Sequence, residues 1–150
     1  MADGKFNPVF AENRKARHDY AVLETVECGI QLKGTEVKSV RHGEVSLSGS
    51  YAAVLNGELW LVGADIAAYK FGNRFNHEPK SMRKLLVHAK EVREMRLKTE
   101  AKGLTLIPLK VYLKGGRVKV AVGVCRGKAL HDKRETLKKK ALRRDLERAV

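Results

Sequence analysis

The chain has 150 residues and a formal net charge of +14, because 31 Lys and Arg residues outnumber 17 Asp and Glu residues. The length suits one domain with appendages, and a hydrophobic content of 43% is enough for one core. No apolar run approaches the roughly 18 residues of a membrane span, and the N-terminus lacks a secretory signal pattern, so the positive charge indicates a polyanion-binding protein and favours nucleic acid over lipid.

The N-terminal third predicts a lead-in, a long strand and a short helix. Residues 1–12 are expected to be a poorly ordered lead. From Tyr20 to Leu32 the apolar residues fall at period two, with a slip around Leu23–Thr25 that indicates a bulge or bend. A helix is predicted over 35–42, with Thr35 as its cap.

Two hairpins have clear turn sequences. Asn56-Gly57 lies between two β-prone runs, and a type I′ turn needs positive φ at both central residues. Gly115-Gly116 separates two further runs, of which the second places Val118, Val120, Val122 and Val124 on one face. Pro108 cannot donate to a sheet, so it predicts an edge or a bulge.

Between the hairpins, the sequence predicts a loop followed by a helix. Gly and Pro residues punctuate 69–80 as a loop. After it, Leu85, Ala89, Val92 and Met95 follow the spacing of one helical stripe, so residues 83–88 are expected to open the helix, with Ser81 able to cap it. Gly103 fits the position just past its end.

This order predicts a mainly β fold with α-helices. A small closed antiparallel β-barrel of the OB type, with inserted helices, is expected over 13–125, since closure removes exposed strand edges. Residues 126–150 carry ten Lys or Arg and four Asp or Glu residues and no aromatic residue, so this basic tail is expected to be disordered when free. It could become helical when phosphates screen its charges.

The motifs of common enzymes are absent from the sequence. There is no GxSxG, no GxxxxGK[ST] and no HExxH, and no two of the five histidines stand at metal-ligand spacing. Cys28 and Cys125 belong to no CxxC pair, so they are expected to be reduced, packed thiols of a cytoplasmic protein. The sequence therefore predicts neither catalysis nor a metal or cofactor.

Basic clusters in the predicted barrel are candidate RNA contacts. In the first, Arg14, Lys15 and Arg17 alternate with Asn13, His18 and Tyr20, a mixture that suits RNA, although a solvated strand entry with a core tyrosine has the same pattern. Other candidates lie on or near the predicted helices. The two acidic ones among them could instead form salt bridges, and the leucine could instead be a core residue. These candidates are Glu27, Lys33, Glu36, Lys38, Arg41, Arg83, Lys84 and Leu86.

Four motifs in the same order resemble one bacterial family. NRKARHDY, GIQLKGTEVKSVR, FNHEPKSMRKLLVHAKEV and GRVKVAVGVCRGKALHDKRETLKKK, together spanning about Asn13 to Lys140, resemble the SsrA-binding proteins, or small protein B family. The resemblance implies an OB-fold protein that is not an enzyme and that binds the tRNA-like domain of transfer-messenger RNA. It implies delivery of that RNA, with elongation factor Tu, to stalled ribosomes for trans-translation, by a monomer without membrane contact.

The resemblance also implies roles for single residues. Asn13, Glu27 and Leu86 match RNA-contact positions of the family, and Arg17 and His18 lie beside the first; the motif with Glu36, Lys38 and Arg41 is expected at the RNA face. The tail is expected to meet small-subunit rRNA at the decoding centre and in the empty mRNA channel. Its candidate residues are Gly127, Lys128, His131, Asp132, Lys133, Arg134, Lys138, Lys139, Lys140, Arg143 and Arg144.

Two departures from the family pattern and two other functions remain open. Ser81 stands where a basic residue is common in the family, and the tail ends early, at Val150. A basic OB-fold protein that binds rRNA or assists ribosome assembly would have the same composition. A tail that binds anionic membrane would too, but it lacks the aromatic anchors typical of interfacial helices.

Overall fold

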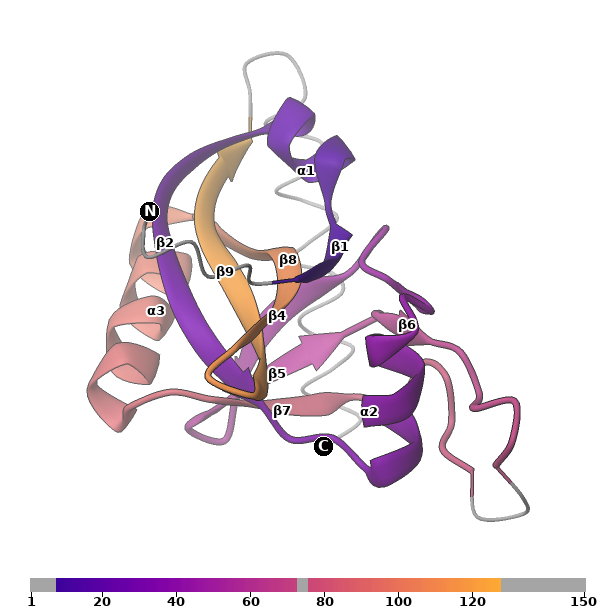
Figure 1. Ribbon diagram of the computed structural model, residues 1–150. Coiled ribbons are helices and arrows are strands. Elements are labelled where there is room, and N and C mark those ends of the chain that lie inside the picture. The colour runs from indigo at the N-terminus through magenta and orange to yellow at the C-terminus, as the bar shows by residue number, and fades with distance from the viewer. Residues whose placement is uncertain (1–7, 73–75, 128–150) are drawn as a thin grey trace.

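A computed structural model gives the structure of residues 8–72 and 76–127. Three helices and nine strands follow one another in this part of the chain (Figure 1). Their bounds are β1 Val9–Glu12, α1 Arg14–Asp19, β2 Tyr20–Ile30, α2 Gly34–Arg41, β3 Val45–Ser46, β4 Tyr51–Leu55, β5 Glu58–Val62, β6 Asp65–Ile66, β7 Arg83–Leu86, α3 Ala89–Lys102, β8 Thr105–Lys114 and β9 Arg117–Gly127.

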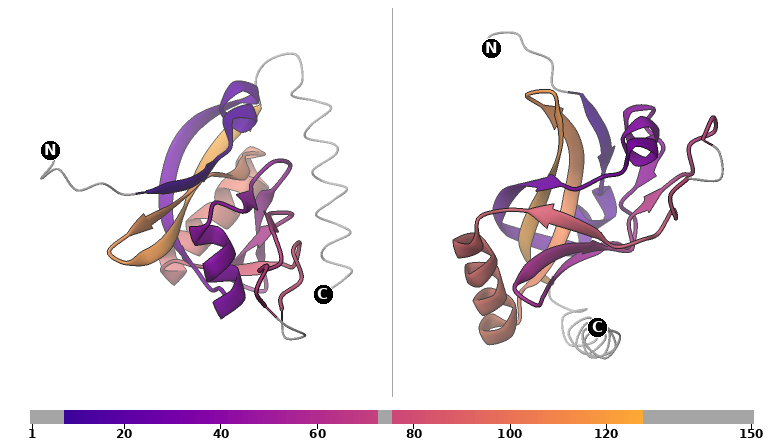
Figure 2. Two further views of the ribbon diagram at one scale, coloured as in Figure 1. Left: turned by 45° about the vertical axis from the view of Figure 1, so that its right-hand side comes forward. Right: turned by 90° about the horizontal axis from the view of Figure 1, so that it is seen from below.

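Most strands of the described residues form one antiparallel, curved sheet. Its order is β1-β8-β4-β5-β7-β2-β9, and an additional β8–β9 pairing joins the far end back to β8. The strands other than β1 therefore form a ring, to which β1 adds at β8, while β3 and β6 pair separately. Helices α2 and α3 lie on opposite sides of this ring (Figures 1 and 2). The prediction of a mainly β fold with helices is confirmed.

The core fills the inside of the ring. Val120, Val122 and Val124 of β9 are buried on its inner face, as their alternation predicted. Val92 and Met95, two members of the predicted helical stripe, are buried on α3 and belong to the same core. A smaller cluster of Ala16, Ile107, Leu109 and Cys125 lies under α1.

Several local predictions are confirmed. Asn56 and Gly57 both have positive φ, 52° and 74°, as a type I′ turn requires, and Gly115 and Gly116 repeat the pattern at the second hairpin. The slip in β2 is a shift of register between Val22 and Glu24, and the sheet is also irregular next to Pro108. Helix α2 lies within one residue of its predicted bounds at each end.

The predicted start of the long helix is wrong. Residues 83–86 form strand β7, and α3 begins only at Ala89, after His88. Leu85 is buried because it faces the core from β7 between β5 and β2. The segment fits a helical stripe in the sequence, yet it forms a strand. If it were helical, the backbone groups of β2 and β5 that face it would lack hydrogen-bond partners. Ser81 caps no helix; its hydroxyl donates to the carbonyl of Glu78.

Three smaller expectations also need correction. Residues 9–12 are not part of a loose lead, because they pair with β8 as β1. Residues 14–19 are helical rather than a strand entry. Thr35 does not cap α2; Lys33 is the N-cap, its backbone amide donates to Glu36, and the Thr35 hydroxyl lies 2.9 Å from Nδ1 of His77.

Strand β9 extends two residues beyond the predicted tail boundary, since Arg126 pairs with Ala21 and Gly127 with Tyr20. Gly127, predicted to belong to the tail, is therefore the last residue of the sheet. The other tail candidates lie outside the described residues. Within the described ranges, no helix is both long enough and apolar enough to cross a membrane.

Candidate nucleic-acid interface

Four strands of the ring place charged side chains, a tyrosine and a leucine together on its outer face. The register aligns Leu86 of β7 with Gly29 of β2, Gly29 with Lys119 of β9, and Lys119 with Tyr112 of β8. The next row aligns Glu27 with Ala121 and Ala121 with Lys110. Directly opposed residues of antiparallel strands point to the same side of the sheet. We call the set Glu27, Leu86, Lys110, Tyr112, Lys114 and Lys119 the β-face patch.

Glu27 is the electrostatic centre of this patch. Its Oε1 accepts a hydrogen bond from the hydroxyl of Tyr112 at 2.5 Å and one from Nζ of Lys114 at 3.3 Å. The hydrogen bond from Tyr112 holds the pKa of Glu27 below its ordinary value, and Lys114 and Lys119 act in the same direction. Burial and the hydrogen bond to Glu27 raise the pKa of Tyr112 well above its ordinary value. The carboxylate is thus ionised at neutral pH and held in one place.

Glu27 nevertheless stays accessible to a ligand. Its side chain is 41% exposed, and its second oxygen, Oε2, has no hydrogen bond with another described residue. Nζ of Lys110 lies 5.0 Å from the centre of the Tyr112 ring, which adds a further cation beside the partner of Glu27. The oriented carboxylate offers an acceptor for base or ribose donors, and the cations beside it offer contacts for phosphates.

Leu86 lies next to Glu27 on the same face. Leu86 is 49% exposed although it belongs to a strand. A Cβ added to Gly29 would lie only 3.3 Å from the Cβ of Leu86. Gly29 therefore leaves room for Leu86 to lie low over β2, two residues from Glu27. Two of the three positions that the family resemblance marked as RNA contacts are brought together here.

The third such position, Asn13, is buried. It is 6% exposed, its Nδ2 donates to the carbonyls of Pro108 and Leu47, and its Oδ1 accepts from the amide of Ala16. Asn13 thus caps α1 and ties it to the irregular part of β8. Both donor hydrogens of its side-chain amide are used inside the protein, and a direct contact of Asn13 with RNA stays a prediction.

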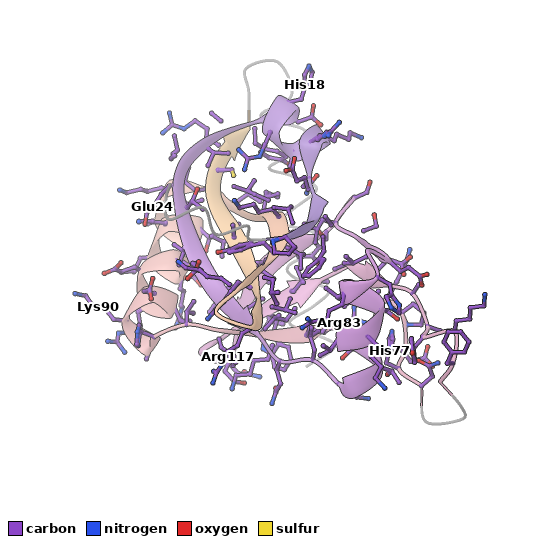
Figure 3. The ribbon with its side chains drawn as sticks, viewed as in Figure 1. His18, Glu24, His77, Arg83, Lys90 and Arg117 are labelled. Atoms are coloured by element: carbon purple, nitrogen blue, oxygen red, sulfur yellow. The ribbon has the colours of Figure 1, made fainter. Side chains whose placement is uncertain are left out.

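Helix α1 presents a second basic cluster at another end of the molecule. Arg14, Lys15, Arg17 and His18 are all exposed on it, and Figure 3 shows His18 at the tip of this helix. His18 and Asp19 lie together on this helix, with Nδ1 and Oδ1 3.1 Å apart. Tyr20 is half-buried and packs against the small cluster under α1, so the alternative of a core tyrosine is the better description.

Glu36 and Arg83, both predicted as RNA contacts, form a buried ion pair, so a direct contact of either side chain with RNA stays a prediction. Each is 3% exposed, and Nε of Arg83 lies 2.5 Å from Oε2 of Glu36. The guanidinium also donates to the carbonyls of Ala64 and Glu78, and Glu36 accepts the amide of Lys33. The pair joins α2 to β7, and its burial keeps both charged groups away from the surface.

The remaining candidates lie apart from one another. Lys33, Lys38 and Arg41 are exposed on and beside α2, whereas Lys84 is half-buried on β7 and bridged to Glu58. The structure adds Lys110, Tyr112, Lys114 and Lys119, which the sequence patterns did not single out. The sequence contained a pattern that could have identified them: in the last hairpin, cations and a tyrosine alternate with the apolar residues of the core face.

Comparison with known proteins identifies the family. The model of the SmpB protein family matches residues 10–150. The SsrA-binding protein of Staphylococcus haemolyticus is 55% identical over 140 residues, which are 93% of this chain and 90% of that protein. The SsrA-binding protein of Carboxydothermus hydrogenoformans is 54% identical over 142 residues, 95% of each chain.

A solved structure supports the same relationship. A chain of "tmRNA-SmpB: a journey to the center of the bacterial ribosome" superposes with a TM-score of 0.67 at 50% sequence identity. The match covers 87% of this chain and 94% of that one. By sequence and by fold, the chain belongs to the SmpB protein family.

Proposed function

We propose that this chain binds the tRNA-like domain of transfer-messenger RNA and brings it to stalled ribosomes for trans-translation. The observation that carries the proposal is the β-face patch, in which Tyr112 and Lys114 hold the ionised Glu27 beside an exposed Leu86. A carboxylate in a strongly basic protein repels phosphates, so its exposed, ordered position favours recognition of base or ribose donors over simple charge attraction. The relatives' name, SsrA-binding protein, agrees with an RNA ligand.

The proposal also includes the type of barrel, the state in which the protein acts and the role of the basic tail. The ring of strands corresponds to a barrel of the OB type, whose outer sheet face suits oligonucleotides. The protein acts as a cytoplasmic, non-enzymatic monomer that stands in the place of a tRNA arm, with elongation factor Tu present on the same RNA. The basic tail from Lys128 to Val150 enters the empty mRNA channel and meets the decoding centre.

The exposed cations of α1 and α2 belong to this RNA-binding role as phosphate contacts. Arg14, Arg17 and Lys38 lie on two different helices, so they are suited to fix the orientation of a folded RNA across the protein rather than to read its sequence. Asn13 and Glu36 contribute indirectly, since they hold α1 and α2 in position.

The central test compares Glu27→Ala with Glu94→Ala, an exposed glutamate on α3. Binding to the isolated tRNA-like domain is measured at fixed salt, with a generic RNA duplex as the second ligand. Loss of a hydrogen bond to a charged group predicts about 10- to 100-fold weaker binding of the tRNA-like domain for Glu27→Ala, without change for the duplex. Equal affinities of the two variants for the tRNA-like domain would contradict the proposed role of Glu27.

A second test separates RNA binding from action on the ribosome. A chain ending at Gly127 keeps all of β9 and loses the tail. Its circular dichroism spectrum serves to check that it is folded. We expect this chain to bind the tRNA-like domain but to fail to support peptide tagging on ribosomes stalled at an mRNA end. Presence of the full chain on non-stalled ribosomes in a one-to-one ratio would instead favour an rRNA-binding assembly protein.

A further inference from the structure

The loop between β6 and β7 carries aromatic rings that take no part in the β-face patch. Tyr69 and Phe71 make an edge-to-face contact with ring centres 5.7 Å apart. His42, at the end of α2, lies with its ring 6.1 Å from that of Tyr69. Nζ of Lys38 lies 5.3 Å from the centre of the Tyr69 ring, and Nζ of Lys70 lies 5.9 Å from that of Phe71. We call these five residues the ring platform.

The ring platform adds little to the stability of the fold. Phe71 is 75% exposed, the largest value among the exposed large hydrophobic residues of the described chain. Burial of apolar surface is what makes a phenylalanine stabilising, and this ring buries little. Because it is exposed, in edge-to-face contact with a second ring and next to a cation, the Phe71 ring is free to bind a ligand.

Hydrogen bonds hold the backbone of Tyr69 in a defined position. The side chain of Asn76 accepts from the amide of Tyr69 at 3.1 Å and donates to its carbonyl at 2.8 Å. A Cβ on Gly72 would lie 2.5 Å from Nδ2 of Asn76, so only glycine leaves room for this contact. His77 is buried and lies 2.9 Å from both Thr35 on α2 and the carbonyl of Ile66, which ties the loop to α2 and β6.

The positive charges around the rings favour a nucleic acid as the ligand. Lys38 and Lys70 border the rings, and Arg41 is exposed one position before His42. Flat aromatic faces bind nucleobases by stacking irrespective of sequence, and nearby cations bind the flanking phosphates. An apolar peptide would gain nothing from the cations, and a membrane surface would need more than one exposed apolar anchor.

We propose that the ring platform is a second RNA contact, at which one unpaired base stacks on Phe71 while Lys38 and Lys70 bind its neighbouring phosphates. His77, which anchors the loop, lies at the other end of the molecule from His18 on α1 (Figure 3), so this contact is separate from the α1 cluster. The inference rests on the proposed function only in that the ligand is RNA. It adds an unpaired nucleotide to the features that the RNA must present.

The test uses the full chain and an eight-nucleotide single-stranded RNA that contains 2-aminopurine, a base whose fluorescence falls when it stacks. Three variants are compared with the wild type: Phe71→Leu keeps apolarity without a ring, Phe71→Tyr keeps the ring, and Leu97→Ala removes an exposed apolar side chain on α3. Loss of one stacking contact predicts about 5- to 100-fold weaker binding and loss of quenching for Phe71→Leu alone.

The outcomes distinguish this inference from the proposed function. Unchanged affinity and quenching in Phe71→Leu would overturn the ring platform, whatever Glu27→Ala does to binding of the tRNA-like domain. If Phe71→Leu instead reduces binding to phosphatidylserine vesicles and leaves RNA binding intact, the partner is lipid and the inference is also overturned. Gly72→Ala, which disturbs the Asn76 contact but removes no ring or charge, should weaken binding of the oligonucleotide in the same way.

Discussion

Replacement of Arg83 by methionine tests whether the Glu36–Arg83 pair is structural, as the geometry indicates. The substitution removes the guanidinium and its hydrogen bonds to Glu36, Ala64 and Glu78. Glu36 then remains as a buried carboxylate with only the amide of Lys33 as a donor among the described contacts. Such an uncompensated buried charge costs about 3–5 kcal/mol in the free energy of unfolding.

For a domain of this size, that loss corresponds to a fall of roughly 6–20 °C in the midpoint of thermal unfolding. Urea denaturation followed by circular dichroism measures the free energy of unfolding directly. Arg96→Met is the matched control, because Arg96 forms an exposed ion pair with Glu100 at i, i+4 spacing and should cost less than about 1 kcal/mol. The double variant Glu36→Leu, Arg83→Met removes both charges and should cost less than Arg83→Met alone.

The same variants decide whether the pair contacts RNA. Well below the unfolding midpoint, Arg83→Met should bind the tRNA-like domain within about threefold of the wild type, because the guanidinium is buried. A stability loss below about 1 kcal/mol would refute the assignment of a structural ion pair. A large loss of RNA affinity in a fully folded variant would refute the claim that these side chains are out of reach of the ligand.

Three further predictions concern the β-face patch. Tyr112→Phe removes the hydrogen bond that lowers the pKa of Glu27, so that pKa should rise toward its ordinary value in an NMR titration. A lowered carboxylate pKa stabilises the fold above the unfolded pKa, and this gain is lost in acid, so the substitution should cost more stability at pH 7 than at pH 3. Gly29→Val should displace Leu86 and weaken binding of the tRNA-like domain while the chain stays folded, as circular dichroism can verify. Lys119→Gln should lower the slope of log affinity against log salt by about one, if this lysine neutralises one phosphate.

The controls for these predictions lie away from the patch. Tyr69→Phe removes a hydroxyl elsewhere and should leave the Glu27 titration unchanged, and Lys90→Gln on α3 should leave the salt slope unchanged. An unaltered Glu27 pKa in Tyr112→Phe, or an unaltered RNA affinity in Gly29→Val, would show that the corresponding contact does not order the patch.

The sequence by itself determined the features that depend on a few adjacent residues. The two hairpins follow from turn residues that accept positive φ, at Asn56-Gly57 and at Gly115-Gly116. The bulge in β2 follows from a break in a period-two pattern. The family assignment likewise rested on short motifs read in order, and the comparisons confirm it.

Only the tertiary structure decided the features that join distant residues. Arg83–Leu86 has residues common in helices, but the neighbouring strands β5 and β2 make it a strand. Glu36 meets Arg83 across 47 positions, and Glu27 meets Tyr112 across 85. Because the first pair is buried, it is a structural link; because Glu27 of the second pair is exposed, that pair is a candidate site. The sequence spacing predicts neither the burial nor the exposure, since both are properties of the packed chain.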